Sequence, residues 1–203
     1  MTQIVILLFD NYTALDIIGP YDVLNKLPNS KVYFVGLEKK EYTDIYGLRI
    51  CADYSIDEIT RADILLIPGG MGIDNLLNDQ VIIDWIKRID QTTKWTVSVC
   101  SGSLLLAQAG LLKGKQCTTH WRRKDQLRNL NGIVKDERYV QDGKLITSAG
   151  VSAGIDMALY LTSKIAGEQT AKMIQLSIEY DPMPPFDCGS PDKVPEEMIN
   201  RMR

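Results

Sequence analysis

Cys100 is the side chain in this sequence best suited to nucleophilic chemistry. It lies in the stretch VSVCSGSLLLAQAGLL, where an apolar segment meets a segment rich in small residues. A chain that passes directly from a buried strand into a helix turns sharply, as at a nucleophile elbow, and we expect this turn to expose the thiol. Amides at the start of the helix would favour the thiolate. A free cysteine is also commonly a small buried hydrophobe, so placement alone leaves both interpretations open.

Two glycines supply candidate hydrogen-bond donors for this chemistry. Gly69 and Gly70 directly follow the apolar run DILLIP. In a parallel sheet they would lie beside the turn at Cys100, where their backbone amides could form an oxyanion hole. A glycine pair by itself is more typical of a tight strand-to-helix loop, and only its combination with the elbow favours the functional interpretation.

Two further side chains could move protons. Asp16 lies in a predicted loop, LDIIGP, and His120, the only histidine, follows Thr119 in the motif TTHW. An isolated aspartate in such a segment is typical of a turn or helix cap. A lone histidine is commonly a structural residue, so neither side chain indicates catalysis without the other motifs.

Alternating strand and helix patterns would position these residues. Continuous apolar runs predict strands that are buried on both faces of a sheet, at residues 3–9, 31–37, 63–68 and 95–99, with a further strand at 48–54. Helical spacing and start signals predict helices at 20–27, beginning with Pro20, and at 80–90, 152–167 and 168–180, with a short capped turn of helix at 55–60. Residues 138–150 predict a hairpin that turns at Asp142-Gly143, and the proline-rich tail 181–191 is expected to be irregular. The alternation predicts an α/β fold with a mostly parallel sheet, in which sites gather at the carboxyl ends of the strands.

Composition excludes several classes of protein. A chain of 203 residues with 45% hydrophobic residues predicts a single domain over 1–203. A net charge of −3 does not predict the basic surface that binds the phosphates of nucleic acid. We expect no membrane association, because no apolar run reaches the roughly 18 residues needed to span a bilayer and the amino terminus does not resemble a signal peptide.

The four cysteines show neither CxxC pairs nor the density of a disulfide scaffold, which favours a reducing compartment, the cytoplasm. Cys51 and Cys117 are expected to be packing residues in strands, and Cys188 lies in the tail.

The combination of LLIPGG, VSVCSGSLLLAQAGLL and TTH, with an acid in LDIIGP, resembles the ThiJ/PfpI superfamily of class I glutamine-amidotransferase-like proteins. Within that superfamily, Asp16, Cys100, TTHW and EYDPMPPFDCGSP are most similar to the isonitrile hydratase branch. The resemblance covers nearly the whole chain. It implies a flavodoxin-like three-layer α/β sandwich with a nucleophile elbow, a cysteine nucleophile, no cofactor or metal, and a homodimer.

The resemblance also implies roles for individual residues. Cys100 matches the family nucleophile, and Asp16 matches an acid that lies against the sulfur, so the two would share one proton and titrate as a unit. His120 matches a histidine that could orient or help deprotonate Cys100, although a structural role stays open. The Ser101 amide, paired with that of Gly70, would stabilise the developing charge.

An apolar pocket is needed for a small organic isonitrile. Ile17, Tyr12 and Trp121 could line it, although core packing is the simpler interpretation for each of them.

These roles predict hydration of a small isonitrile to an N-substituted formamide. Ser101 departs from branches with histidine after the cysteine, which counts against proteolysis. Asp16 replaces the glutamate common in glyoxalase and deglycase branches, which counts less strongly against those activities. The alternatives are a glyoxalase-, deglycase- or amidase-like cysteine hydrolase and a non-catalytic redox or ligand sensor.

Overall fold

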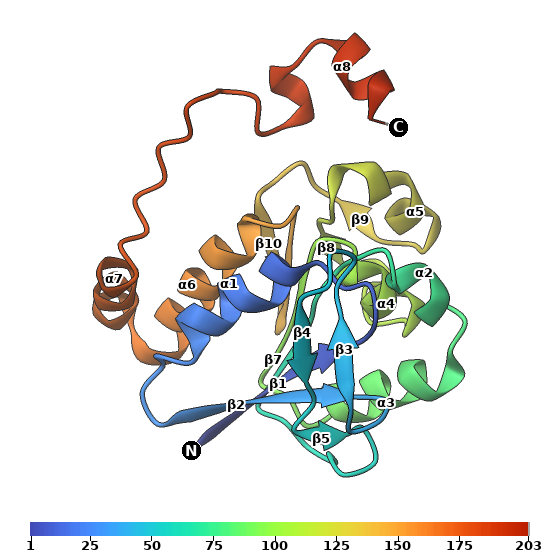
Figure 1. Ribbon diagram of the computed structural model, residues 1–203, viewed down its shortest axis with the longest axis vertical. Helices are drawn as coiled ribbons and strands as arrows, with labels where there is room; N and C mark the ends of the chain where they lie inside the picture. Colours follow the sequence, from blue (N-terminus) through green and yellow to red (C-terminus); the bar gives the residue numbers. More distant parts are fainter. Residues whose placement is uncertain (203) are drawn as a thin grey trace.

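The computed structural model describes residues 1–202 and has a seven-stranded sheet at its centre (Figure 1). The strand order is β10-β11-β7-β6-β1-β2-β5, and only the pair β10 and β11 is antiparallel. The strands are β1 (Thr2–Leu8), β2 (Ser30–Gly36), β5 (Tyr54–Ser55), β6 (Ile64–Ile67), β7 (Trp95–Val99), β10 (Tyr139–Asp142) and β11 (Leu145–Ser148). The mostly parallel sheet that the sequence predicts is therefore confirmed.

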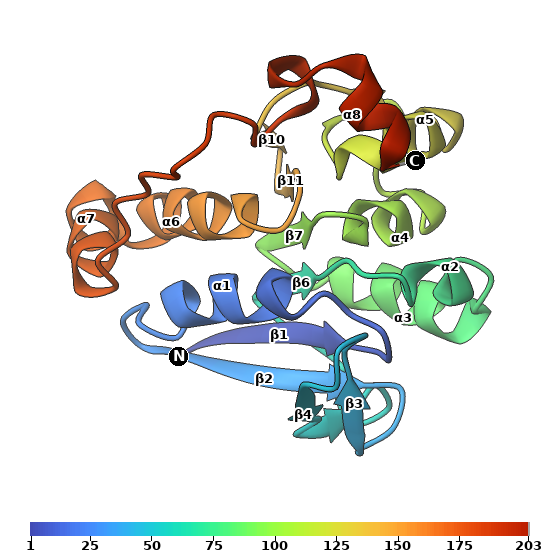
Figure 2. The same cartoon turned by 45° about the horizontal axis from the view of Figure 1, so that its top comes forward.

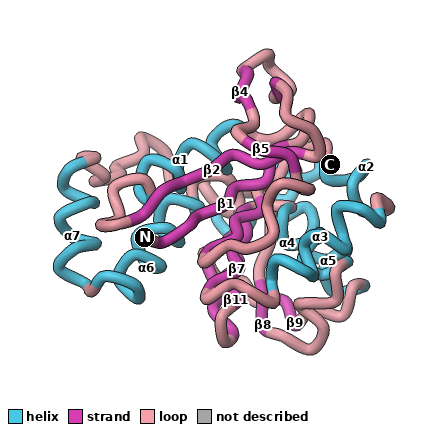
Figure 3. The backbone as a smooth tube through the Cα atoms, turned by 90° about the horizontal axis from the view of Figure 1, so that it is seen from below, coloured by secondary structure: helices cyan, strands magenta, loops and turns pink. Residues whose placement is uncertain are grey.

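Helices cover both faces of this sheet and complete a three-layer sandwich. Helices α1 and α6 lie on one face, with α7 outside α6, and α3 and α4 lie on the other (Figures 2 and 3). Their bounds are α1 (Ala14–Leu24), α3 (Gln80–Asp90), α4 (Gly102–Gln108), α6 (Ala153–Ala166) and α7 (Glu168–Ser177).

The central strands are buried on both faces, as their continuous apolar sequences require. Every residue of β6 and the last five residues of β1 are buried. Full burial of each large aliphatic side chain contributes roughly 1.5–3 kcal/mol. Since β1, β6, β7 and β11 run parallel, the loops that follow them meet at one edge of the sheet.

One predicted helix is confirmed with its boundaries, and the predicted hairpin is confirmed with its turn one residue later, at Gly143-Lys144 instead of Asp142-Gly143. Helix α3 spans Gln80–Asp90, and the Asp79 carboxylate caps it by accepting from Val81 N–H at 3.0 Å and Ile82 N–H at 3.3 Å. The hairpin of β10 and β11 turns after Asp142 at Gly143, whose φ of 63° suits a residue without a Cβ.

The prediction that a helix begins at Pro20 is wrong, as is the placement of Asp16 in a loop. Helix α1 begins at Ala14 and contains both residues. Pro20 lacks an N–H and gives up only the bond to the carbonyl of Asp16. The remaining helix survives because its inner face, which includes Ile17 and Val23, is fully buried.

The predicted strand at 48–54 is also wrong as a single element. Its first part is β4 (Arg49–Cys51), which pairs with β3 (Glu41–Thr43) in a separate hairpin, and Tyr54 alone joins the main sheet as part of β5. The predicted helical turn at 55–60 is a non-helical turn, in which Glu58 accepts from Ser55 N–H at 2.8 Å. The Glu58 carboxylate thus caps the turn, and no helix begins at these residues.

The remaining elements lie at the edges of the sandwich. They are the pair β8 (Gln116–Cys117) and β9 (Ile133–Val134), the short helices α2 (Ile73–Leu76), α5 (Lys124–Asn129) and α8 (Glu196–Arg201), and two 3-10 helices, η1 (Trp121–Arg123) and η2 (Pro191–Lys193). The tail leaves α7, is extended over 181–189, and returns to the body with α8 (Figure 1). Within residues 1–202, none of the helices has the length and apolar character needed to cross a bilayer.

Candidate active site

The chain makes a sharp turn at Cys100, between the end of β7 and the start of α4. Its φ is 55°, an unusual value for a residue with a side chain, and costs on the order of 1–2 kcal/mol. The turn is held by Cys100 N–H, which donates to Ala149 O at 2.9 Å and to Ser148 O at 3.2 Å. The sharp turn that the sequence indicates is present, but Cys100 is only 7% exposed. The expected exposure of the thiol is therefore wrong.

Asp16 lies beside this turn and is completely buried. Its Oδ2 accepts from Gly69 N–H at 2.9 Å, while Oδ1 has no partner among the described residues. Gly69 makes this approach possible, because a Cβ there would lie 2.6 Å from Ser101 N and 2.8 Å from Asp16 Oδ2. Burial raises the pKa of Asp16 to about 7, although Gly69 N–H and the Cys100 thiol stabilise its charged form.

The neighbouring thiol holds its proton more tightly. Burial, and next the Asp16 carboxylate, raise the pKa of Cys100 to about 12. Hydrogen bonds from the backbone N–H groups of Ser101 and Val151 oppose this rise. The expected effect of the helix amides is present in direction, because the Ser101 amide lowers the pKa of Cys100, but burial and the Asp16 carboxylate outweigh it. One proton is retained between Asp16 and Cys100 well above neutral pH.

The two glycine amides face protein partners instead of an open oxyanion hole. Gly69 N–H is held by Asp16, and Gly70 N–H donates to Ser101 Oγ at 3.0 Å. Ser101 Oγ also donates to Gly70 O at 3.3 Å. The amides of Ser101 and Val151 and the Ser101 hydroxyl lower the pKa of the Cys100 thiol. Whether the Gly70 and Ser101 amides stabilise a developing charge stays a prediction.

Val151 is a site residue that the sequence interpretation missed. It follows β11, the strand beside β7, and its φ is 20°, which is strained for a β-branched residue. Its side chain carries no functional group, so residue type gave no signal. The rule that loops at the carboxyl ends of neighbouring strands meet would have located its backbone.

His120 lies near the elbow without bonding to the sulfur. Its Nδ1 accepts from Arg122 N–H at 3.3 Å. The ring packs on Gly150, where a Cβ would lie 2.9 Å from His120 Cδ2. Burial lowers the pKa of His120, as do the charges of Arg122 and Arg123, so the ring is neutral at pH 7. The direct connection to the elbow is made by Thr119 Oγ1, which donates to Cys100 O at 2.9 Å.

The proposed apolar wall is only partly present. Tyr12 and Ile17 are completely buried, and Tyr12 OH donates to Leu48 O at 2.8 Å. Both are core residues, so the expectation that Ile17 contacts substrate is wrong. Trp121 is half-buried and borders a cavity.

The other cysteines lie outside this cluster, and all four are free thiols. Cys117 is buried, as expected for a packing residue, but Cys51 is exposed because β4 belongs to the separate hairpin. Within residues 1–202, no group of three or more His, Cys, Asp or Glu side chains is arranged to hold a metal ion.

Known proteins share both the sequence and the fold. The model of the DJ-1/PfpI family matches residues 2–164. An isonitrile hydratase from Pseudomonas putida is 41% identical over 99% of this chain and 88% of its own length. A deglycase from Thermococcus kodakarensis is 26% identical over 72% of this chain and 89% of its own length. A crystal structure of a ThiJ/PfpI family protein from Pseudomonas syringae has a TM-score of 0.96 at 33% identity, over 99% of this chain and 84% of that one.

Proposed function

The chain belongs to the DJ-1/PfpI family, and from this premise we propose that it hydrates small organic isonitriles to N-substituted formamides, with Cys100 as the nucleophile. The observation that carries the proposal is the buried pair of Cys100 and Asp16, in which one acid of raised pKa lies beside one thiol. The similarity to an isonitrile hydratase over nearly the whole chain supports the same activity.

The pair can supply both the nucleophile and the proton. The Cys100 S–H proton passes to Asp16 as the sulfur attacks the terminal carbon of R–N≡C. The amides of Ser101 and Val151 stabilise the sulfur while it carries negative charge. Asp16 then gives the proton to the attacked carbon, which yields the thioimidate S–CH=N–R.

Water completes the reaction. It adds to the thioimidate carbon, and the carbon–sulfur bond breaks to release HC(=O)–NH–R and return the proton to the pair. Covalent capture divides a difficult addition of water into two easier steps. We propose that His120, which is neutral and close to the elbow, positions the elbow through the adjacent Thr119.

A pulse of cyclohexyl isocyanide followed by acid quenching and mass spectrometry tests this proposal. We expect a mass increase of one isocyanide on the peptide that contains Cys100, and N-cyclohexylformamide in the supernatant. Cys100→Ala should show neither product. Formamide production by Cys100→Ala at the wild-type rate would refute the nucleophile.

The family also contains a named deglycase, so a glyoxalase- or deglycase-like reaction at the same thiol is the competing enzymatic function. Lactate formation from methylglyoxal, with no formamide from isocyanide, would establish that alternative. A redox sensor is less compatible with the geometry. The raised pKa of Cys100 leaves little thiolate at neutral pH, and peroxide oxidises the thiolate.

The proposal includes a homodimer in the cytoplasm. Exposed apolar side chains lie on α1 (Leu15 and Ile18) and at the tip of the β3–β4 hairpin (Ile45, Tyr46 and Leu48). We name these five residues the apolar face. The hairpin tip lies at the start of α1, because Tyr12 OH bonds to Leu48 O. A surface of this kind supports self-association, and four free thiols are compatible with a reducing compartment.

A further inference from the structure

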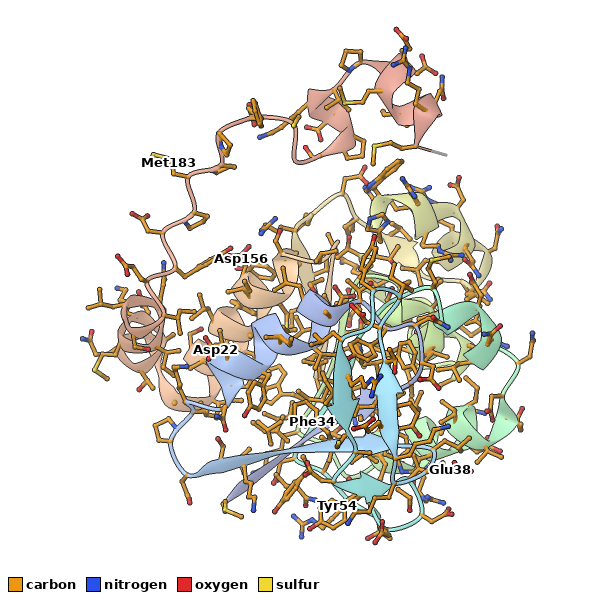
Figure 4. The ribbon with its side chains drawn as sticks, in the orientation of Figure 1. Asp22, Phe34, Glu38, Tyr54, Asp156 and Met183 are labelled. Carbon is orange, nitrogen blue, oxygen red and sulfur yellow. The ribbon has the colours of Figure 1, made fainter. Side chains whose placement is uncertain are left out.

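The C-terminal segment 180–202, here called the strap, is attached to the body on both sides of the candidate site. At its start, the Tyr180 hydroxyl lies close to Asp156 and Arg138, and burial, helped by the Asp156 carboxylate, raises the pKa of Tyr180. Arg138 Nη2 in turn donates to Ser152 Oγ at 3.2 Å, next to Val151. Figure 4 shows Asp156 on α6 below the strap, and Met183 in the extended part of the strap, away from the body.

The far end of the strap encloses a cavity against Trp121. Its volume is about 100 Å³. Apart from Trp121, its lining comes entirely from the strap: Cys188, Gly189, Ser190, Pro191, Val194, Met198, Ile199 and Met202. Most of these side chains are apolar, and the two methionines can adapt to ligands of different shape. The cavity is thus suited to a small hydrocarbon group.

Short contacts connect this cavity with the reacting sulfur. The rings of Trp121 and His120 have centroids 5.7 Å apart. The His120 ring packs on Gly150, and the next residue, Val151, donates its N–H to Cys100. No residue of the Cys100 cluster lines the cavity itself, and the connection between the two runs through His120 and Gly150.

We propose that the cavity between Trp121 and the strap binds the hydrocarbon substituent of the isonitrile and so determines which isonitriles are hydrated. This inference rests on the proposed function. An isonitrile is linear at nitrogen, so a substrate with its terminal carbon at the sulfur carries its substituent away from the elbow. Tyr12 and Ile17 are fully buried and offer that substituent no surface. Trp121 and the strap provide a partly open apolar surface in the residues described.

The test compares methionines of the strap that differ in position. Met198 lines the cavity, whereas Met183 is 92% exposed and lies in the extended part of the same segment. Met198→Trp fills the cavity, and Met183→Trp is its matched control. The measurement is kcat/KM for cyclohexyl and for methyl isocyanide, from which the cyclohexyl-to-methyl ratio is calculated.

We expect Met198→Trp to lower this ratio by about tenfold or more, since shape complementarity in an apolar pocket discriminates by about 10- to 200-fold. Met183→Trp should leave the ratio within twofold of wild type. An unchanged ratio in Met198→Trp, with normal turnover of both isocyanides, would overturn the inference and leave the proposed function intact.

A binding measurement separates the two proposals if no isocyanide is turned over. Titration with N-cyclohexylformamide should change the tryptophan fluorescence of wild type, and the change should be lost in Trp121→Phe and Met198→Trp but kept in Met183→Trp. A protein that binds in this way without turnover would refute the hydratase and retain the cavity as an apolar binding site. Absence of this fluorescence change in wild type would refute the cavity itself.

Discussion

At the scale of single residues, the candidate site is a buried acid, Asp16, beside a buried thiol, Cys100. Asp16 Oδ2 is held by Gly69 N–H, and Asp16 Oδ1 has no protein partner among residues 1–202. A buried oxygen without a partner is costly when charged, which helps to raise the pKa of Asp16. Oδ1 is therefore the atom that we expect to take the proton from Cys100 and deliver it to substrate.

Asp16→Asn tests this delivery. The amide keeps the shape of the side chain but cannot act as the acid, so isonitrile turnover should fall by at least about a hundredfold. Alkylation of Cys100 by iodoacetamide needs only access and a thiolate, and it should persist with a changed pH profile. Steady-state kinetics and alkylation rates, measured on the same preparations, give the comparison. Near-normal turnover in Asp16→Asn would refute the acid role and make His120 the first candidate for proton donor.

The same carboxyl predicts a pH dependence of stability. The folded state raises the pKa of Asp16 from 3.8 to about 7, so folding favours the protonated acid. Its contribution is fully present below pH 4 and is lost as pH rises through about 7, by an amount on the order of 4 kcal/mol. Urea unfolding of wild type and Asp16→Asn from pH 4 to 8 should show this difference. Parallel stability curves for the two proteins would contradict the raised pKa.

At the scale of elements, the sequence was most informative where one pattern decided the outcome. Helix α3 has helical spacing and an Asp79 cap, and the strands β6 and β7 are short apolar runs, so all were predicted correctly. Helix α1 begins earlier than predicted. Pro20 locally indicates a helix start, whereas burial of the face that includes Ile17 and Val23 extends the helix back to Ala14. Tertiary packing overrides such local preferences.

The proximity of the candidate side chains was predictable from the sequence, and the backbone geometry around them was not. Cys100 and Asp16 have chemical groups that can be recognised in a sequence, and the structure brings them together. Which amides point at the sulfur depends on φ and ψ at Ser101 and Val151, and residue type does not specify these angles. The partners of Gly69 and Gly70 amides were missed for the same reason.

Helix α4 approaches the end of β6 because residue 102 is glycine. A Cβ on Gly102 would lie 2.2 Å from Ile67 O. Gly102→Ala should therefore displace α4 and the elbow, lower the free energy of unfolding by about 3 kcal/mol, and reduce turnover. Gly110→Ala, just beyond the other end of α4, is the control. Its φ is 81° with open space around it, so it should cost only about 1 kcal/mol. Equal losses of stability in chemical denaturation would contradict this packing argument.

At the scale of the whole molecule, both attachments of the strap are tertiary contacts. Tyr180 lies close to Asp156 and Arg138, and Trp121 meets residues more than sixty positions later in the chain. The proline-rich composition of 181–191 predicts an irregular segment, which residues 181–190 confirm, but it contains no information about where the segment returns. That destination, beside Trp121, is set by tertiary contacts of the tail.

The apolar face leads to a prediction about assembly. Ile18 on α1 and Leu48 on the hairpin are 40% and 43% exposed, and Tyr46 at the hairpin tip is 89% exposed. Burying this face against a second copy would remove apolar area from water, and a stable dimer typically buries about 800 Å² per partner. Sedimentation should therefore show a dimer at micromolar concentration.

Ile18→Glu should convert that dimer to a monomer, because it places a charge in the centre of an apolar contact without a partner. Leu176→Glu is the matched control, since Leu176 is 80% exposed on α7 and lies outside the apolar face. It should remain dimeric. Circular dichroism of both variants establishes that they are folded. A monomeric wild type would refute the homodimer, and a dimer that persists in Ile18→Glu would place its interface on another surface.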